Sequence, residues 1–379
     1  MRILFVLDYY YPHIGGGEVV FQHLAEGLVN RGHIVKVITS NSINGLPKKE
    51  FNNGVEIERI NTPKSGDRYL FSILSARSVF RAARQTDVIH TSAFGGALIA
   101  FLAARKARRP IIFTILEVIG NRWRQVERNP FRAFFYKLIE KVIIKLPYDY
   151  WVAISDATLK DAWNIHVSKT KSIRIYNGVD NAENFHIERT GILQKTIGAE
   201  KNDFIYLYYG RPGITKGLQY LIRAVPEILK AIPNSRLVLI LSNQPREQYN
   251  KIRKEISLIN DAARIHVLPT LKEKNDLYIY LVDADCIVIP SITEGFGLSA
   301  AEACSLNIPV VATRAGSLPE VVSGCHLLIV PASSQAITEA VIKIYHKDWD
   351  ETPLKKFSWD VMVSDYEAIY LRLLKTYIT

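Results

Sequence analysis

The stretch DCIVIPSITEGFGLSAAEACSLNIPVVAT, residues 285–313, decides the fold class. It opens with an apolar, β-branched run at 285–290 and closes with a similar run at 308–313. Between them lie a glycine-containing loop and a segment that we expect to form a helix beginning near Leu298. A buried strand, a helix and a second buried strand are the repeating unit of a parallel sheet covered on both faces.

The same rhythm runs along the whole chain and predicts an α/β protein. The expected strands are 3–7, 34–39, 87–91, 111–115, 150–154, 204–209, 236–241, 264–268, 285–290, 308–313 and 326–330. Two such series indicate two doubly wound, Rossmann-like domains, with a boundary in the polar stretch 179–203. We therefore assign residues 1–185 and 186–355 to the two domains. Residues 356–379 are expected to form a C-terminal helix, about 359–377, that packs back on the N-terminal domain.

Composition narrows the class of protein. The chain has 379 residues, of which 48% are hydrophobic and 22% charged, which excludes a disordered chain, a collagen and a coiled coil. The net charge is +11, and residues 1–185 hold 26 Lys and Arg against 16 Asp and Glu. Residues 186–379 hold 22 against 21. The basic excess therefore belongs to the N-terminal domain and indicates a polyanionic partner.

Compartment signals point to the cytoplasm. The three cysteines, an odd number without CxxC spacing, are typical of reduced thiols rather than of disulfides or a zinc site. The apolar run 3–7 is too short for a signal peptide, and the longest apolar stretch, 93–104, is too short to span a membrane. Any membrane contact is expected to be peripheral.

Chemistry-bearing residues follow several of the expected strands. Gly15, Gly16 and Gly17 come after the first strand and open a helix, where backbone amides can approach an anion. A plain tight turn is the alternative for this triplet. Arg211 and Lys216 follow the first strand of the second domain and can both reach one diphosphate, although such a pair is often merely solvated.

The opening stretch carries two acids eight residues apart. Glu294 precedes a loop, Gly295-Phe296-Gly297, and Glu302 lies about one turn into the helix that begins near Leu298. A carboxylate in this place can accept hydrogen bonds from sugar hydroxyls while loop amides and the helix N-terminus hold phosphate. We interpret the stretch as a cradle for a sugar nucleotide.

These pieces together resemble the retaining glycosyltransferases of family 4, which have the GT-B fold of two Rossmann-like domains facing across a cleft. The resemblance spans nearly the whole chain and includes YNGVD at 176–180 and AGSLPEVV at 315–322. It implies that the C-terminal domain binds a UDP- or GDP-sugar and that the N-terminal domain binds the acceptor. The implied catalytic residues are Glu294, Arg211 and Lys216. The implied donor contacts are Gly16, Gly17, Glu294, Gly295, Phe296, Gly297, Leu298 and Glu302.

The resemblance departs from the family pattern at several positions, of which Leu116 bears most on the function. Where the family usually places a histidine, after the strand at 111–115, this chain has Leu116, followed by Glu117. Glu117, His13 and His90 are therefore candidates for contact with the acceptor or the donor sugar, although a structural role for His90 is the alternative.

The C-terminal domain contains a sequence that matches a metal-binding motif. Asp283-Ala284-Asp285 matches the DxD pattern of other glycosyltransferases, but it begins a strand at the end away from the expected ligand site. We expect it to be structural, and we expect no cofactor and no metal, with the cations and the helix N-terminus stabilising the leaving diphosphate.

The basic charge gathers in residues 68–145, with 15 Lys and Arg against 4 acids. Within it, 129–146 is predicted to be an amphipathic helix in which aromatic and basic residues alternate. The cations are Arg122, Arg124, Arg128 and Arg132, and the aromatics are Trp123, Phe131, Phe134, Phe135 and Tyr136. A solvated basic helix is one interpretation and a peripheral contact with an anionic membrane is the other. No motif for reading nucleic acid accompanies this segment.

The sequence therefore predicts a retaining, metal-independent glycosyltransferase acting on a lipid-linked or glycan acceptor at the cytoplasmic membrane face. Two alternatives remain open. One is a non-catalytic GT-B subunit or nucleotide-binding scaffold, which the leucine at position 116 suggests. The other is a sugar-nucleotide epimerase of the same fold, which the EGFGL motif disfavours.

Overall fold

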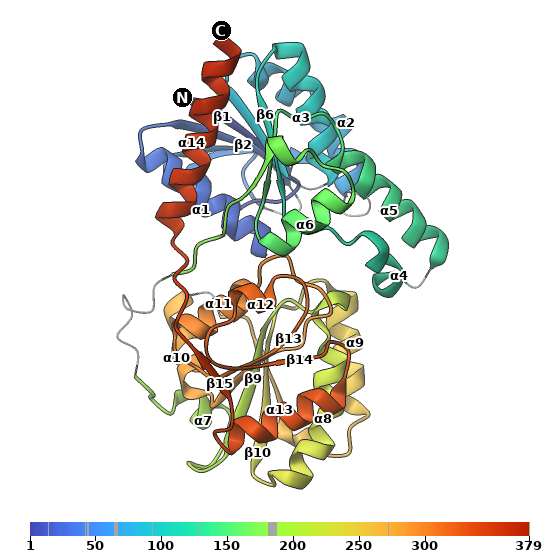
Figure 1. The fold of residues 1–379 in the computed structure, drawn as a ribbon, viewed down its shortest axis with the longest axis vertical. Coiled ribbons are helices and arrows are strands. Elements are labelled where there is room, and N and C mark those ends of the chain that lie inside the picture. The colour runs from blue at the N-terminus through green and yellow to red at the C-terminus, as the bar shows by residue number, and fades with distance from the viewer. Residues whose placement is uncertain are drawn as a thin grey trace. The chain divides into compact units, whose positions relative to one another are not determined.

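The computed structural model describes residues 1–13, 15–41, 43, 45–63, 67–92, 94–127, 129–180, 188–271 and 273–378. The chain divides into two compact units: unit 1 comprises Met1–Gly178 and Ser358–Thr379, and unit 2 comprises Val179–Phe357 (Figure 1). The first division therefore falls several residues before the expected boundary at 185, and the second falls two residues after the expected one at 355.

Unit 1 is built on a mostly parallel sheet of eight strands in the described part of the chain, in the order β3-β4-β2-β1-β5-β6-β7-β8. Only the β3–β4 pair is antiparallel among these strands. The strands are β1 (Arg2–Val6), β2 (Ile34–Asn41), β3 (Lys49–Asn52), β4 (Val55–Asn61), β5 (Val88–Ser92), β6 (Ile111–Ile115), β7 (Tyr150–Ala153) and β8 (Ser172–Arg174).

Helices cover both faces of this sheet. They are α1 (Gly16–Asn30), α2 (Asp67–Ala83), α3 (Phe94–Ala107), α4 (Trp123–Val126), α5 (Pro130–Ile144), α6 (Asp156–Asn164) and α14 (Trp359–Ile378), with short 3-10 turns at Gly120–Arg122 and Lys169–Lys171. On one face Leu4 and Val6 of β1 pack with apolar residues of α2, α3, α5 and α6. On the other face Phe5 packs against Phe21 of α1. This alternation along one strand places a separate core on each side of the sheet.

The C-terminal helix belongs to unit 1. Trp359, its first residue, stacks on His23 of α1 with ring centroids 4.0 Å apart. Arg31, just after α1, binds Glu367 of α14 at 2.8 Å. Gly178 ends the first segment of unit 1 and lies close to Trp359. A Cβ added to Gly178 would lie 2.3 Å from the backbone nitrogen of Trp359. Both segments of unit 1 are thus packed together where they leave the unit.

Unit 2 repeats the architecture with a sheet in the order β11-β10-β9-β12-β13-β14-β15. All neighbours are parallel except β14 and β15. The strands are β9 (Phe204–Gly210), β10 (Ser235–Leu241), β11 (Ile265–Pro269), β12 (Cys286–Ile289), β13 (Val310–Thr313), β14 (Gly324–Ile329) and β15 (Asp350–Thr352). The helices are α7 (Ile192–Ile197), α8 (Leu218–Ala231), α9 (Arg246–Ser257), α10 (Lys274–Asp283), α11 (Leu298–Ser305), α12 (Leu318–Val321) and α13 (Ser334–Tyr345), with 3-10 turns at Ile214–Lys216 and Ala262–Arg264.

Strand β9 lies inside this sheet, and its residues are buried on both faces. Tyr206 and Tyr208 face a core shared with α8, α9 and α13. Leu207 and Tyr209 face the opposite core, shared with α7, α10, α11 and α12. A run that is apolar at every position is therefore buried on both sides, which is typical of a central parallel strand. The expectation of a two-domain, doubly wound α/β fold is confirmed.

Candidate functional site

Two loops of unit 2 meet at the carboxyl ends of the neighbouring strands β9 and β12. The backbone N–H of Ile292, after β12, donates to the carbonyl of Thr215, after β9, at 2.7 Å. Gly217 closes the first loop with φ of +66°, and a Cβ there would lie 2.0 Å from the carbonyl oxygen of Pro290. Only glycine permits this approach, which brings the two loops together at the sheet edge where open α/β folds bind ligands.

An ion pair joins these loops. The Lys216 ammonium contacts both carboxylate oxygens of Glu294, at 3.0 and 2.7 Å, and Ser291 Oγ donates to the same carboxylate at 3.0 Å. The Glu294 side chain is mostly buried, whereas Lys216 is about one-third exposed (15% and 32%). The lysine and the acid singled out from the sequence are therefore in direct contact.

The backbone around Glu294 is fixed by the turn that follows β13. The N–H of Ser317 donates to the Glu294 carbonyl at 3.1 Å. Gly316 has φ of +52°, and a Cβ on it would lie 2.0 Å from that same carbonyl oxygen. The turn AGSLPEVV thus holds the Glu294 loop through contacts that need glycine.

A second polar cluster surrounds Glu302 on α11. Its carboxylate accepts a hydrogen bond from the Tyr209 hydroxyl at 3.0 Å and lies 3.3 Å from the Lys274 ammonium. Lys274 also pairs with Asp180 at 2.6 Å. Tyr209 ends the buried run of β9, Lys274 begins α10, and Asp180 follows Val179 at the start of unit 2. Two segments therefore contact the Glu302 carboxylate directly, and a third is joined to it through Lys274.

Burial controls the charges in this cluster. Desolvation raises the pKa of Glu302 above its ordinary value, and the nearby Lys274 ammonium opposes that rise. Burial alone would lower the pKa of Lys274, but the carboxylates of Glu302 and Asp180 more than offset it, so its pKa is raised. Burial also raises the pKa of Tyr209, which keeps the phenol protonated as a donor. The cluster is an ion pair whose carboxylate can accept further hydrogen bonds.

The segment between the two acids is built for close backbone approach. Gly297 has φ of +89° and caps α11, which begins at Leu298. Phe296 is buried and packs edge-on against Phe357, with ring centroids 5.2 Å apart, so its side chain anchors the loop. Any contact of Phe296 with a ligand would therefore be made by its backbone. Arg211 is exposed, and its carbonyl accepts a hydrogen bond from the Tyr208 hydroxyl at 3.2 Å.

The DxD-like acids serve as structural groups. Asp283 accepts hydrogen bonds from the backbone N–H groups of Thr190, Gly191 and Leu193. Asp285 pairs with Arg189 at 3.0 Å. These contacts hold the segment around α7 against the start of β12, at the end of the strand opposite Glu294. Among the described residues, no group of three or more His, Cys, Asp or Glu side chains is placed to hold a metal ion.

In unit 1 the glycine triplet follows β1 as expected. Gly16 is exposed as the first residue of α1, and Gly15 before it is buried in an extended conformation. Asp8, also after β1, accepts from the N–H groups of Gly95 and Gly96 at the start of α3, at 3.1 and 2.7 Å. Both helices therefore begin beside the carboxyl end of β1.

Leu116 lies against this glycine loop. Its Cδ1 is 2.6 Å from where a Cβ on Gly17 would lie, so the leucine fills the space that a side chain at 17 would need. Glu117 is partly exposed directly after it. His13 stacks on Tyr9 and lies 3.8 Å from Glu18. The structure thus brings Leu116 and Gly17 together where β6 and β1 end.

The expectation that His90 contacts a substrate is wrong. His90 is completely buried, and its two ring nitrogens bond the hydroxyls of Tyr370 and Thr114 at 2.6 and 2.7 Å. Burial lowers its pKa to about 3, so the ring is neutral. The structure assigns it a role in the core between the sheet and α14.

Sequence reasoning missed three members of the Glu302 cluster. Tyr209 is an ordinary residue of an apolar strand, and Lys274 is one cation among many. Asp180 stands inside YNGVD, a motif of the family resemblance in which the acid had no assigned role. No local spacing links the three, because segments far apart in sequence bring them to one carboxylate.

Comparison with known proteins identifies the family of the chain. The family model described as "Glycosyltransferase Family 4" matches residues 14–183, and the one described as "Glycosyl transferases group 1" matches residues 191–357. An uncharacterized glycosyltransferase of Methanocaldococcus jannaschii is 26% identical, covering 98% of each chain. One of the subunits of the phosphatidylinositol N-acetylglucosaminyltransferase of Arabidopsis thaliana is 22% identical over 99% of this chain and 83% of the relative.

Solved structures show the same fold. The sucrose-phosphate synthase of Thermosynechococcus elongatus superposes with a TM-score of 0.79 at 19% identity, covering 99% of this chain and all of the other. Anabaena HepE in complex with UDP-glucose gives a TM-score of 0.73 at 18% identity, covering 100% and 98%. The two matched regions and the paired Rossmann-like units together show that this chain belongs to the family 4 glycosyltransferases and has the GT-B fold.

Proposed function

We propose that this glycosyltransferase moves a sugar from a UDP- or GDP-sugar to an acceptor hydroxyl, retaining the configuration at the anomeric carbon and using no metal. The observation that carries the proposal is the pair of polar clusters at the carboxyl ends of β9 and β12, Lys216–Glu294 and Glu302–Tyr209–Lys274. They offer carboxylates for hydroxyl groups and cations for phosphate within one unit. HepE, which has the same fold, binds UDP-glucose.

The donor binds unit 2 in this proposal. Glu302 accepts hydrogen bonds from the ribose hydroxyls, because one phenol and one shared ammonium leave acceptor capacity on its two carboxylate oxygens. Glu294 contacts the donor sugar, and the amides of Gly295 to Leu298 approach the diphosphate. Arg211 is exposed and Lys216 is one-third exposed, so both can turn toward phosphate oxygens.

The chemical step balances without a metal. The bond between the anomeric carbon and the diphosphate oxygen breaks, and its electron pair leaves with the nucleoside diphosphate. The acceptor oxygen forms its bond to the same face of the anomeric carbon, and its proton passes to the departing diphosphate. Arg211, Lys216 and the N-terminus of α11 supply fixed positive charge where negative charge develops, which is the usual way that enzymes stabilise such a leaving group.

Unit 1 is proposed to supply the acceptor side. Gly16 and Gly17 would approach the diphosphate through their amides, and Glu117 and His13 would contact the acceptor or the donor sugar. Leu116 offers no proton donor and lies against Gly17, which is the observation behind the competing hypothesis of a non-catalytic subunit. The intact Lys216–Glu294 pair and Glu302 cluster favour catalysis.

The acceptor is proposed to be lipid-linked, or a glycan, at the cytoplasmic face of a membrane, with the protein peripherally bound and with no nucleic acid as a partner. The basic excess of residues 68–145 supports an anionic membrane surface. The relative from Arabidopsis thaliana is named for transfer to phosphatidylinositol, a lipid. No helix in the described part of the chain is long and apolar enough to cross a membrane.

Titration of UDP, GDP and ADP into the protein, followed by thermal unfolding, tests the donor site. A nucleotide present at 100 times its dissociation constant adds about 2.7 kcal/mol to the free energy of unfolding, an easily measured shift. We expect one nucleotide to stabilise the wild type and Lys251→Ala, which disrupts a surface Lys–Glu pair on α9. Lys216→Ala and Glu302→Gln should lose most of that shift. Equal shifts in all four proteins would refute the donor site.

A further inference from the structure

Helix α5 carries an apolar stripe that the described part of unit 1 leaves uncovered. Phe131 is 85% exposed and Phe134 is 68% exposed, and the stripe continues one side of the helix at spacings of three and four residues. Its members are Phe131, Phe134, Phe135, Leu138 and Val142, all exposed. The opposite side of α5, with Ala133 and Ile144, is buried against the unit. The helix therefore has two apolar faces, and only one of them belongs to the core.

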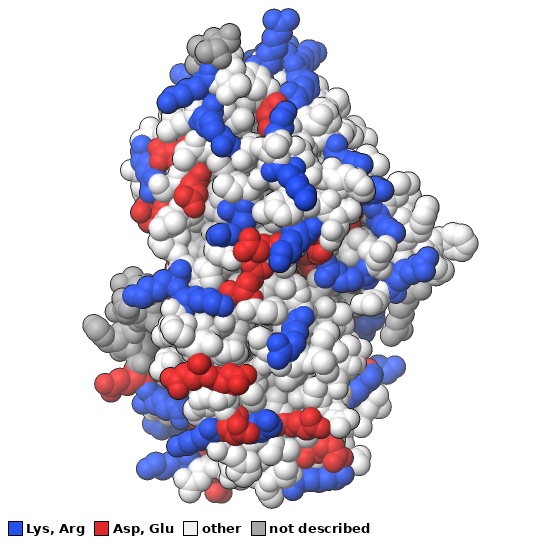
Figure 2. Space-filling view, viewed as in Figure 1, with Lys and Arg blue, Asp and Glu red and all other residues white. Residues whose placement is uncertain are grey.

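The exposed charged residues described on α5 are basic, whereas one partly exposed acid, Glu127, lies just before the helix and accepts from the N–H of Asn129. Exposed Arg124, Arg132, Lys137, Lys141 and Lys145 lie on or beside α5. The acid of the helix, Glu140, is buried and points inward, accepting from the N–H groups of Ile119 and Gly120 at 2.8 and 2.7 Å. Figure 2 shows uncharged surface over α5 with blue basic side chains at its margin.

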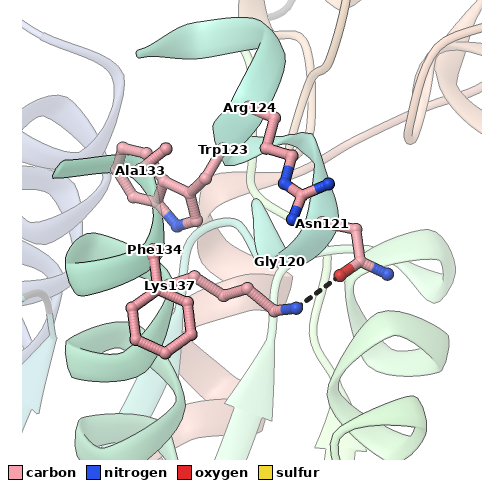
Figure 3. A pocket seen from close by; sticks show the side chains of 7 residues that line it. All are labelled: Gly120, Asn121, Trp123, Arg124, Ala133, Phe134 and Lys137. Carbon is pink, nitrogen blue, oxygen red and sulfur yellow. Dashed lines mark hydrogen bonds between the residues drawn. The ribbon is translucent and has the colours of Figure 1, made fainter. Parts of the chain in front are cut away.

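A hollow of about 330 Å³ opens beside the stripe, between α5 and the turn before α4. It is lined by Gly120, Asn121, Trp123, Arg124, Ala133, Phe134 and Lys137. Figure 3 shows Arg124 and Lys137 on its polar side, with the Lys137 ammonium donating to Asn121 Oδ1 at 2.6 Å, and the rings of Trp123 and Phe134 on its apolar side. No acidic residue is among the lining residues, so the hollow combines two cations with an apolar wall.

Burial of Glu140 keeps this hollow in shape. Its carboxylate also accepts from the Trp123 indole N–H at 3.1 Å. The ring of Trp123 is thereby fixed against α5, with its centroid 5.3 Å from that of Tyr136. The buried acid therefore joins the turn before α4 to α5, beside the Lys137–Asn121 contact.

We propose that α5 and the turn before α4 form a docking surface for an anionic phospholipid bilayer. The apolar stripe enters the interfacial layer with the helix lying in the plane of the membrane, and Arg124 and Lys137 hold a lipid phosphate in the hollow. The inference rests on the proposed membrane-associated acceptor and names the surface that would reach it. An apolar stripe whose exposed charged neighbours on the helix are cations matches the apolar and anionic layers of such a membrane.

Vesicle co-sedimentation of the full chain tests the apolar stripe. We expect recovery with vesicles of phosphatidylcholine containing about one-third phosphatidylglycerol, and little recovery with phosphatidylcholine alone. The variant Phe131→Ser/Phe134→Ser/Phe135→Ser should abolish recovery at low salt. The matched control is Phe51→Ser, which removes another highly exposed phenylalanine of unit 1 on β3. Unchanged binding by the triple variant, or loss of binding by the control, overturns the assignment of the stripe.

A second pair of variants tests the hollow. Each basic side chain near an anionic surface contributes about fivefold in affinity, so Arg124→Ala/Lys137→Ala should weaken binding by about 25-fold. The control Lys160→Ala/Lys195→Ala removes two exposed lysines elsewhere and should change binding little. If free inorganic phosphate at millimolar concentration stabilises the wild type but anionic vesicles do not bind it, the hollow takes a soluble phosphate and the membrane assignment is overturned.

Two further readouts separate this inference from the proposed function. Donor hydrolysis without acceptor should be unchanged in the triple phenylalanine variant, because the donor clusters lie in unit 2. If the triple variant loses vesicle binding but hydrolyses the donor normally, the docking surface is supported. If the wild type hydrolyses no donor, that result counts against the proposed function alone. A dimer in sedimentation equilibrium that the triple variant dissociates would assign the stripe to a second copy and overturn the membrane assignment.

Discussion

Replacing Lys274 with methionine gives the sharpest test of the electrostatics around Glu302. The ammonium lies 3.3 Å from one carboxylate oxygen of Glu302 and 2.6 Å from Asp180. At an effective dielectric constant of about 20, the contact with Glu302 alone corresponds to roughly 5 kcal/mol of gross attraction. Lys274 is one-third exposed, so water recovers much of this when the pair is broken. We expect Lys274→Met to destabilise unit 2 by about 1–2 kcal/mol at pH 7.5.

The loss should depend on pH, with a sign that follows from Glu302. Burial already raises the pKa of this carboxyl, and removing the ammonium that opposes the rise raises it further. A carboxyl with a raised pKa in the folded state binds protons more tightly there than when unfolded, so stability falls as pH rises from its ordinary pKa through the folded one. The difference between Lys274→Met and the wild type should therefore shrink as pH is lowered toward 5.

Urea unfolding measured from pH 5 to pH 8 provides the assay. The double variant Lys274→Met/Glu302→Gln removes the buried charge as well as its partner and should regain much of the lost stability at pH 7.5. Lys251→Met, in an exposed pair, should be nearly neutral at every pH. A loss of equal size at all pH values, or a double variant no more stable than Lys274→Met, would refute the reasoning.

Three further predictions concern the backbone turns and the buried histidine. Gly316→Ala should weaken nucleotide binding at least tenfold and also destabilise unit 2, because its Cβ would meet the Glu294 carbonyl at 2.0 Å and shift that loop. Titration calorimetry of the protein that remains folded measures the affinity, and an unchanged affinity would contradict the prediction. Gly178→Ala should lower the free energy of unfolding by about 2 kcal/mol or more, because its Cβ would meet Trp359. The control is Gly32→Ala, where the φ is positive but nothing lies within 4 Å of the added Cβ. Urea unfolding should show a smaller loss of stability for this control. For His90, whose pKa is lowered to about 3, the wild type should lose stability as pH falls below about 6.5, and His90→Asn should remove that slope; an identical slope in both proteins would rule out His90 as its source.

The fold was predictable where strands are buried on both faces. The run 204–209 is apolar throughout, and β9 has a core on each side. Strand β4 was missed because its pattern alternates: Val55 and Ile57 are buried while Glu56 and Glu58 are partly exposed and bind Lys36. Short edge strands such as β8 and β15 carry little apolar signal of their own. Central strands can therefore be predicted from their composition, whereas the formation of edge strands depends on pairing with neighbouring strands.

The site was predictable only where its residues lie in one segment or directly follow a strand. Glu294 and Lys216 each follow a strand that ends at the same sheet edge, and the structure joins them in an ion pair. Lys274 could not be found, since its role arises from the packing of α10 beside α11 and the segment at Asp180. His90 lies near the end of the predicted strand 87–91 but in the middle of β5, and α14, more than 250 residues later, covers it with Tyr370. Long-range packing decides which strand-end residues face a ligand.

The same limit applies to α5. Its sequence predicted an amphipathic helix over 129–146, and the helix spans Pro130–Ile144. Periodicity alone left open whether the aromatic residues form core or surface, because either face of the helix could have been buried. Arg128, one of the cations named with it, lies outside the described residues. Exposure of Phe131 and Phe134 settles that the aromatic face is not core.

Donor turnover without acceptor is the measurement that tests the central claim most directly. Release of UDP or GDP from a panel of nucleotide sugars, in buffer containing EDTA, should be detectable for the wild type with at least one donor. Lys216→Ala removes a positive charge proposed to stabilise the leaving group, and Glu294→Gln removes the carboxylate proposed to contact the donor sugar. Each should reduce kcat/KM at least a hundredfold, while Lys251→Ala should match the wild type. Turnover that disappears with EDTA and returns with Mn²⁺, or turnover that survives both substitutions, would contradict the account.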